Sequence, residues 1–489
     1  MRAVVVGAGI GGLASAALLA KNGFSVVVLE KLDRPGGRAR VMQEGGYSFD
    51  MGPSWYLMPE VFQHFFSLLD TSQDKFYRLI RLDPSFRLST DVREVEMRPE
   101  LEDNREALDQ LEPGGYDRFL KYLKRVRDLY YSTLGLLYRD YALHDLLDTR
   151  VAFRLLALNP FRSMNWLNSL YFRSQEMLYL TGFPAVFLGG DPFRVPAFYA
   201  MINYPVFGQG VFYPSGGFGS VVEALMRLGQ SLGVEYRFNR EVKGVKVGSG
   251  EIRAVISEEG EHEADVFVFN ADYHHVETQL LPPQHRSYPE SYWERLKLSP
   301  SAILIYLGLR GRAATPHHNV VIRGDWRDHF SRLFQGRLPD PRSASYYVSV
   351  RSRSDRVAPE GREAIFFLIP VPSGHADPDY LTLAGQVEAH FLEKYCSGEV
   401  EFRRVFTPAD FEVQYNAFRG TAFGPSHTLR QTAMFRPRTR SSKLRNTFFV
   451  GQYVHPGIGV PMVLISAEIV SSKIVSEFGG EVRVSREVT

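Results

Sequence analysis

The first thirty residues alternate between short apolar runs and turns. Residues 2–6 (RAVVV) and 25–29 (SVVVL) are rich in β-branched side chains, which is typical of buried strands. Between them, apolar residues at helical spacing predict a helix over residues 13–21, and Gly23 marks its end. The chain therefore opens with a predicted strand, helix and strand, the βαβ unit in which both strands lie parallel in one sheet.

The same patterns recur along the chain and predict a mixed architecture. Apolar and β-branched runs predict strands at residues 234–238, 242–247, 252–257, 265–269, 301–309, 364–371 and 447–450. Helical spacing predicts helices at residues 117–131 and 462–472. This order indicates an α/β fold, α+β overall, in which a Rossmann-type domain is combined with a domain of helices and a mixed sheet.

Three glycines at fixed spacing give the first turn a specific chemistry. Gly7, Gly9 and Gly12 form the pattern GxGxxG between strand and helix. In this pattern the glycines permit a tight turn, close approach of backbone to a pyrophosphate, and close packing of helix on strand, while the helix N-terminus attracts the phosphates. Glu30, at the end of the second strand, is positioned to accept hydrogen bonds from an adenosine ribose and would repel a 2′-phosphate.

Uncharged stretches suggest export signals or membrane spans, but their details argue otherwise. Residues 3–20 follow Arg2 and are long enough for a signal peptide, yet that interpretation does not account for the glycine spacing or for Glu30. Residues 195–222 and 446–467 contain prolines and glycines that would break a membrane-spanning helix. We therefore expect a dinucleotide site and no integral membrane segment.

The composition excludes several classes of protein. Of 489 residues, 44% are hydrophobic and 23% charged, the balance of a globular and not a disordered chain. Lys plus Arg exceed Asp plus Glu by only 57 to 55, so we expect no nucleic-acid partner. The single cysteine, Cys396, excludes an internal disulfide and a thiolate metal cluster. The aromatic fraction of 13% is high, and such rings often line a large apolar cavity.

Further motifs narrow the choice of dinucleotide. These are residues 34–38 (RPGGR), 49–55 (FDMGPSW), 212–219 (FYPSGGFG), 270–272 (NAD), 317–318 (HH), 435–437 (FRP) and 450–461 (VGQYVHPGIGVP). In the first of them, Arg38 can offer a planar fork to phosphate or flavin oxygens. Together with GxGxxG and Glu30, these motifs resemble the bacterial phytoene desaturases, a carotenoid desaturase family of FAD-dependent oxidoreductases in the amine oxidase-like superfamily. The resemblance spans essentially the whole chain.

The resemblance implies FAD as cofactor and a set of residues that contact it. These residues are Gly7, Gly9, Gly11, Gly12, Glu30, Lys31, Gly37, Arg38, Gly52, Pro53, Ser54, Val242, Gly451, Gly459, Val460, Pro461 and Met462. The first-turn amides of the predicted helix 462–472 would approach the edge of the flavin, where negative charge grows on reduction. Gln452, Tyr453 and Ile458 replace smaller residues of the family, so we expect a different shape beside the flavin.

The resemblance also implies a discontinuous division into domains. Residues 1–70, 210–290 and 410–489 would form the FAD-binding domain, and residues 71–209 and 291–409 the substrate-binding domain. Residues 150–175 interleave arginine with aromatic side chains and contain no acid, which suits a helix in the lipid headgroup layer. A buried helix with its arginines outward is the alternative. Because the implied substrate dissolves in lipid, we expect a cytoplasmic protein attached peripherally to the cytoplasmic membrane.

The implied reaction is FAD-dependent desaturation of phytoene or a related acyclic carotenoid, a long apolar isoprenoid, with oxygen or a quinone as the final electron acceptor. A flavin provides the two-electron acceptor that such chemistry needs, so neither a catalytic triad nor a metal is required. We find no metal motif, and we interpret the pairs His274–His275 and His317–His318 as structural. Asp145 is the candidate proton acceptor, with a helix N-cap or a solvated carboxylate as the alternative; other catalytic residues are unassigned.

Three other functions are compatible with these motifs. A flavin-dependent carotenoid cis-trans isomerase would use the same scaffold without net redox change. An amine oxidase-like flavoenzyme would oxidise a small polar substrate and release peroxide. A carotenoid-binding relative would keep the flavin without turnover. The motif at residues 450–461 favours the desaturase over the amine oxidase.

Overall fold

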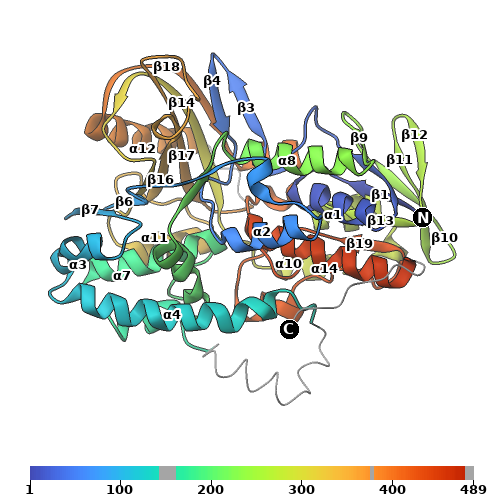
Figure 1. The fold of residues 1–489 in the computed structure, drawn as a ribbon, viewed down its shortest axis with the longest axis horizontal. Coiled ribbons are helices and arrows are strands. Elements are labelled where there is room, and N and C mark those ends of the chain that lie inside the picture. The colour runs from blue at the N-terminus through green and yellow to red at the C-terminus, as the bar shows by residue number, and fades with distance from the viewer. Residues whose placement is uncertain (142–160, 375–378, 480–489) are drawn as a thin grey trace.

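A parallel five-stranded sheet lies at one end of the molecule (Figure 1). The structure is a computed structural model that describes residues 1–141, 161–374 and 379–479. In spatial order the strands are β19 (Thr447–Phe449), β13 (Val266–Phe269), β1 (Arg2–Val6), β2 (Ser25–Leu29) and β9 (Glu235–Arg237). All four pairings are parallel. Helix α1 (Ile10–Lys21) connects β1 to β2, which confirms the predicted βαβ opening and the α/β fold class.

This sheet is buried on both faces, because successive side chains of a strand point to opposite sides. Ala3 and Val5 of β1 pack with the helices α1, α8 (Phe218–Ser231) and α14 (Val460–Phe478). Val4 and Val6 pack on the other face, in a cluster that contains residues of a three-stranded sheet. That smaller sheet consists of β10 (Gly244–Gly248), β11 (Glu251–Ser257) and β12 (Gly260–Glu263).

A mixed seven-stranded sheet lies at the other end (Figure 1). In spatial order its strands are β18 (Cys396–Phe406), β14 (Ser301–Ala313), β17 (Arg362–Val371), β16 (Tyr346–Val350), β15 (His318–Val321), β6 (Phe86–Ser89) and β7 (Glu94–Met97). The predicted strands 301–309 and 364–371 lie within β14 and β17, which are antiparallel neighbours. Helix α12 (Tyr380–Tyr395) packs on one face through Leu383 and Val387.

Helices and an aromatic core occupy the space beside this sheet. The helices are α3 (Arg105–Leu111), α4 (Gly115–Leu137), α6 (Met164–Ser169), α7 (Gln175–Gly182) and α11 (Trp326–Phe334). The predicted helix 117–131 lies within α4, which runs along the base of the molecule in Figure 1. The remaining helices and strands are α2 (Pro59–Ser67), α9 (Tyr273–His275), α10 (Glu290–Arg295), α13 (Pro408–Tyr415), β3 (Val41–Glu44), β4 (Tyr47–Asp50), β5 (Leu79–Arg81) and β8 (Phe212–Pro214).

Two predictions from the sequence concern membrane-spanning helices and the division of the chain into domains. Among the helices of the described residues, none is both long and apolar enough to cross a membrane. The five-stranded sheet takes strands from each of the three segments 1–70, 210–290 and 410–489. We propose that the two domains follow the two large sheets, and the exact boundaries stay a prediction.

Candidate cofactor and substrate site

The GxGxxG turn closes tightly onto the end of β13. Gly7 has a φ of +99°, and its amide donates a hydrogen bond of 2.8 Å to the carbonyl oxygen of Leu29. A Cβ on Gly12 would lie 2.0 Å from the carbonyl oxygen of Gly7, so only glycine permits this contact between helix and strand. Asn270, with its amide oxygen turned towards the loop, accepts hydrogen bonds of 3.2 Å from the amides of Gly9 and Gly12. Asn270 therefore holds the turn in shape.

Glu30 lies at the end of β2 and is almost fully buried. One carboxylate oxygen accepts a hydrogen bond of 2.6 Å from the Ala8 amide, and the other accepts one of 2.9 Å from the Leu32 amide. Burial raises the pKa of Glu30 above its ordinary value, and the backbone hydrogen bonds oppose that rise. Each oxygen keeps a second acceptor direction, so the carboxylate can still bind ribose hydroxyls.

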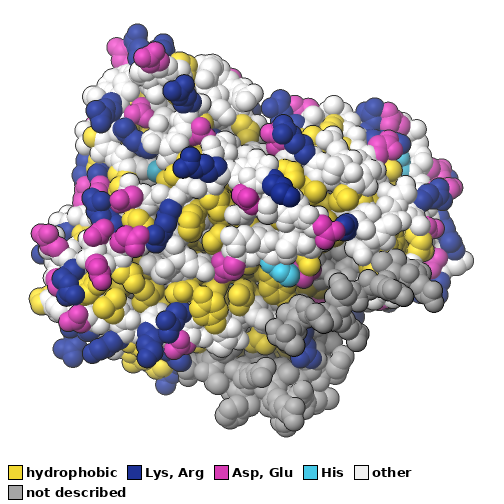
Figure 2. Space-filling view, in the orientation of Figure 1, with side chains coloured by type: hydrophobic (Ala, Val, Ile, Leu, Met, Phe, Trp, Pro, Cys, Tyr) yellow, Lys and Arg dark blue, Asp and Glu magenta, His cyan; other side chains and the backbone are white. Residues whose placement is uncertain are grey.

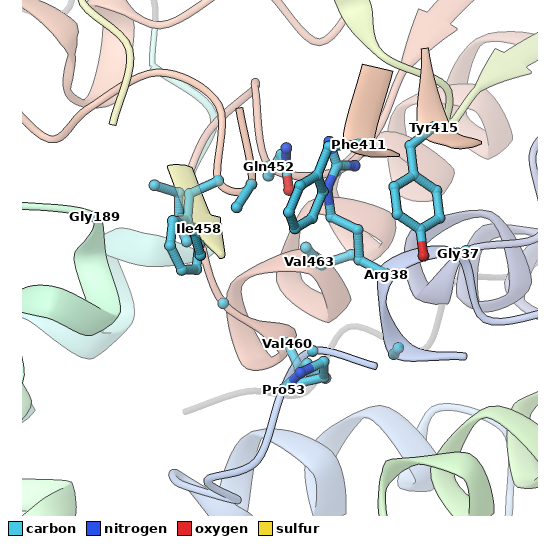
Figure 3. Close-up of a pocket in the computed structure, with 18 of the residues that line it drawn as sticks. Gly37, Arg38, Pro53, Gly189, Phe411, Tyr415, Gln452, Ile458, Val460 and Val463 are labelled. Atoms are coloured by element: carbon cyan, nitrogen blue, oxygen red, sulfur yellow. The ribbon is translucent and has the colours of Figure 1, made fainter. Parts of the chain in front are cut away.

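Arg38 is brought to the same place by the glycine pair before it. Gly36 and Gly37 both have positive φ, of +112° and +54°, and a Cβ on Gly37 would lie 3.4 Å from the Cα of Gly9. The guanidinium of Arg38 lies 5.3 Å from the ring centre of Tyr415 and donates a hydrogen bond of 3.3 Å to the carbonyl oxygen of Thr421. Figure 3 shows Arg38 beside Tyr415 on one side of the cavity and Ile458 on the other.

Lys31 and Val242, two of the predicted cofactor residues, line the same cavity as Glu30. The ammonium of Lys31 donates hydrogen bonds to the carbonyl oxygen of Val413 (3.1 Å) and to Oδ1 of Asn416 (3.0 Å). Burial lowers the pKa of Lys31 from its ordinary value, and the carboxylate of Glu241 opposes this shift. Val242 is a buried residue just before β10, and it lines the cavity.

A second strand–turn–helix meets the first from the opposite end of the chain. β19 leads into residues 451–459, where Gly451 and Gly459 have φ of +112° and +114°, and α14 begins at Val460. The buried Arg436 holds this loop through backbone carbonyl oxygens, which include those of Gln452, Tyr453 and Val454. Within the part of the chain that the structure describes, no carboxylate pairs with Arg436, so its charge is used to fix the loop that the sequence places at the flavin.

One cavity, of about 500 Å³, joins nearly all predicted cofactor residues. Sixteen of the seventeen line it: Gly7, Gly9, Gly11, Glu30, Lys31, Gly37, Arg38, Gly52, Pro53, Ser54, Val242, Gly451, Gly459, Val460, Pro461 and Met462. Gly12 does not line the cavity, because it is packed against the backbone of the turn. Their contacts with FAD stay predictions. Asp145 lies outside the described residues.

The cavity continues away from these motifs into an arm with apolar and aromatic walls. Trp55 is central to the arm: its ring stacks on the ring of His318 at 4.6 Å and lies 5.0 Å from that of Phe187. Nδ1 of His318 is hydrogen-bonded to the hydroxyl of Tyr347 at 2.6 Å, so this histidine supports two residues of the wall, Trp55 and Tyr347. Other residues of the arm are Leu57, Met58, Tyr130, Phe183, Met201, Ile202, Val321, Trp326, Phe330 and Leu333.

Sequence reasoning noted some of these residues without assigning them a place in the site. Asn270 and Arg436 belong to the motifs at residues 270–272 and 435–437, and the signal that could have identified them is their position in the fold. Asn270, for example, follows β13, whose carboxyl end lies beside that of β1 in a parallel sheet. Tyr415 and His329 have no local signal of this kind. They reach the cavity only through the tertiary fold.

The residues at the cofactor end fit a dinucleotide with a polar ring. The Nε of Arg38 and the amide nitrogen of Gln452 are buried and have no hydrogen-bond partner within the described residues. Buried donors of this kind require an acceptor, which a pyrophosphate or a flavin carbonyl supplies. The N-terminus of α1, which begins at Ile10 within the glycine turn, favours an anion through the helix dipole. These features agree with FAD as the ligand.

Known proteins agree with this assignment. The profile of a family described as flavin containing amine oxidoreductase matches residues 10–475. The carotenoid 3,4-desaturase of Haloarcula japonica is 36% identical over 97% of this chain and 98% of its own length. The zeta-carotene-forming phytoene desaturase of Myxococcus xanthus is 35% identical over 97% of this chain and 94% of its own.

Solved structures share the fold at low sequence identity. Putrescine oxidase bound to putrescine superposes with a TM-score of 0.63 at 15% identity, over 98% of this chain and 100% of its own. An oxidoreductase from Methanosarcina mazei gives a TM-score of 0.62 at 18% identity, over 96% and 100%. With a family match over nearly its full length, the chain belongs to the flavin-containing amine oxidoreductases.

Proposed function

We propose that this protein is an FAD-dependent desaturase that converts phytoene or a related acyclic carotenoid to a more conjugated polyene. The observation that carries the proposal is a continuous cavity that joins the predicted cofactor residues to an arm with apolar and aromatic walls. The relatives at 35% and 36% identity, whose names describe carotenoid desaturation, support the choice of substrate.

The chain's own contribution to this reaction is alignment and exclusion of water. Trp55, Phe183 and Phe187 form one side of the arm next to Pro53 and Ser54, where an extended hydrocarbon can lie along the predicted flavin position. When bound, FAD supplies a two-electron acceptor for hydride from an allylic carbon. The apolar walls stabilise the hydrocarbon by removing it from water, at about 25 cal/mol per Å² of buried surface.

The arm does not suit an amine. The acidic residues that line the cavity are Glu30, Glu241 and Asp272, and all three lie at the cofactor end. Among the described residues of the arm there is neither aspartate nor glutamate to pair with an ammonium group. A buried charge without a partner is strongly unfavourable, so this lining favours a hydrocarbon.

The test uses purified, FAD-loaded protein and liposomes that contain phytoene. We expect absorption bands of a longer polyene to appear, either with oxygen or anaerobically with a membrane quinone; comparing the two conditions identifies the electron acceptor. No new bands, together with isomerisation of poly-cis lycopene, would reassign the protein as an isomerase. Peroxide released with putrescine would reassign it as an amine oxidase.

We also propose that the protein attaches peripherally to a membrane through α4 and residues 161–172. Phe161 and Leu170 are 77% and 60% exposed, and Tyr131 of α4 is exposed as well. Figure 2 shows hydrophobic side chains gathered in a band along α4. Exposed cations on this helix, Lys121, Lys124 and Arg127, suit anionic headgroups. Within the expected contact 150–175, only residues 161–175 are described, and there Met164, Leu167 and Phe172 are buried.

Flotation with anionic liposomes tests this surface. The double exchange Phe161→Asp and Leu170→Asp should reduce the bound fraction, because charged side chains do not enter the headgroup layer readily. The control is Val413→Asp, which changes an exposed hydrophobic residue on α13, outside α4 and residues 161–172. Equal flotation of the double variant and the unaltered protein would contradict the proposed contact.

A further inference from the structure

His329 is a polar residue inside the apolar arm of the cavity. It lies on α11, one turn after Trp326, and is 5% exposed. Trp326, Phe330 and Leu333 of the same helix also line the cavity, so this face of α11 forms part of its wall. In Figure 1, α11 lies on the side of the molecule opposite β1 and α1. His329 is therefore distant from the glycine turn between β1 and α1.

The imidazole of His329 lacks the hydrogen bond that other buried histidines make. Its Nδ1 is buried and has no partner in the described part of the chain. Among the described residues, the other four buried histidines each use one ring nitrogen: His317 bonds Ser354, His318 bonds Tyr347, His427 bonds the Leu188 carbonyl and His455 bonds the Leu137 carbonyl. A buried polar atom without a partner is unfavourable, and a ligand that supplies one is favoured.

Two other polar side chains that line the cavity already make hydrogen bonds within the protein, whereas His329 remains available to a ligand. The hydroxyl of Ser345, which also lines the cavity, accepts a hydrogen bond of 3.2 Å from the Arg323 amide. The hydroxyl of Tyr346 is bonded to Nδ1 of His390 at 2.7 Å. Burial lowers the pKa of His329 to about 4, so near neutral pH the ring is uncharged and has one donor and one acceptor. A neutral imidazole of this kind matches a hydroxyl, which also donates and accepts.

We propose that His329 hydrogen-bonds an oxygen function at one end of the carotenoid, so that the preferred substrate is an acyclic carotenoid with a terminal hydroxyl. This inference rests on the proposed desaturase function and narrows its substrate class. A hydrocarbon end at the same position would leave the imidazole unpaired. Sites built to bind a hydroxyl discriminate strongly against the analogue that lacks it.

Two probes test the preference: phytoene, and phytoene with a tertiary hydroxyl on one terminal carbon, both in liposomes. For the FAD-loaded protein we expect kcat/KM to favour the hydroxylated probe by about ten- to a hundredfold. His329→Phe should bring the ratio close to one, mainly by slowing the hydroxylated probe. His329→Gln keeps a donor and an acceptor and should retain part of the preference.

Phe330→Leu is the matched control, since Phe330 is the next residue of α11 and also lines the cavity. It should change both probes by the same factor and leave the ratio intact. Equal kcat/KM for the two probes, or an unchanged ratio in His329→Phe, would overturn the inference. Equal losses on both probes in His329→Phe would also overturn it, because they would assign His329 a packing role.

Binding without turnover separates this inference from the proposed function. Trp326 lies in the cavity wall one helical turn before His329, and a ligand that packs against an indole ring can quench its fluorescence. Tighter quenching by the hydroxylated probe, lost in His329→Phe, would support the inference even if neither probe were desaturated. Desaturation of both probes with identical quenching curves would retain the function and reject the role of His329.

Discussion

The buried arginine behind the flavin loop offers the most direct test of how the site is held. Arg436 is 3% exposed and donates hydrogen bonds to backbone oxygens on both sides of it. The acceptors are the carbonyl oxygens of Gln452 (2.5 Å), Tyr453 (3.1 Å), Val454 (3.2 Å), Gln431 (3.2 Å) and Pro425 (3.5 Å). Burial lowers the pKa of Arg436 to about 10, yet the side chain stays charged at neutral pH.

The perturbation is Arg436→Met, which preserves much of the side-chain volume and removes every donor. Four of the five acceptors lie within 3.2 Å, and hydrogen bonds to a charged group contribute about 1.5–3 kcal/mol each. The burial cost of the guanidinium offsets part of this sum. We expect a net decrease of about 2–5 kcal/mol in the free energy of unfolding.

The assay combines urea unfolding with flavin content, measured as visible absorbance per mole of protein after gel filtration. We expect Arg436→Met to lose flavin as well as stability, because both ends of the loop 451–459 line the cavity, at residues 451–453 and 458–459. Arg438→Met is the control, since Arg438 is an exposed arginine two residues along the chain. Unchanged stability and full flavin content in Arg436→Met would refute the reasoning, as would an equal loss in Arg438→Met.

Three further changes test other parts of the site. Gly12→Ala should lower the free energy of unfolding by about 1–3 kcal/mol and prevent flavin binding, since its Cβ would collide with backbone, whereas Gly385→Ala in α12 meets open space and should be tolerated. Glu30→Ala should lower flavin retention, because it removes the carboxylate expected to bind the ribose; full yellow occupancy would reject that role. The hydrogen bond to Glu468 raises the pKa of His64 in the folded protein. The contribution of this pair to stability is therefore fully present below about pH 6.5 and is lost as the pH rises through the raised pKa of the folded state. Unfolding measured across this pH range should lose that dependence in His64→Ala.

Local sequence patterns were sufficient to predict the helices and strands whose buried residues lie close together in the sequence. The predicted strand 2–6 matches β1, because its apolar residues are continuous and a glycine follows at once. The helix predicted at 462–472 continues to Phe478 as α14, since Ile474 and Val475 remain buried beyond the polar residues that ended the apolar pattern. The strand predicted at 242–247 begins instead at Gly244, because Val242 packs towards the cavity and β10.

Long-range pairing was beyond sequence reasoning. β6 pairs in parallel with β15, so that Leu88 lies opposite Val320, although no local feature of either strand specifies the other. The arm of the cavity depends on such pairings, because Val321 and Trp55 meet there from distant parts of the chain. His329 illustrates the consequence: a histidine in a helix is unremarkable until the fold shows what surrounds it.

The order of strands in the five-stranded sheet affects how the protein is made. β1 and β2 leave the ribosome before β13 and β19, which complete one side of the same sheet, with β19 at its edge. Until residues 447–449 emerge, the nascent chain has an open edge at β13, which is a hazard for association with other chains. Helix α14, which closes the same half of the molecule, emerges later still. Coenzyme capture must therefore follow synthesis of β19 and α14, and chains released before that point would carry the glycine turn without the loop that faces it.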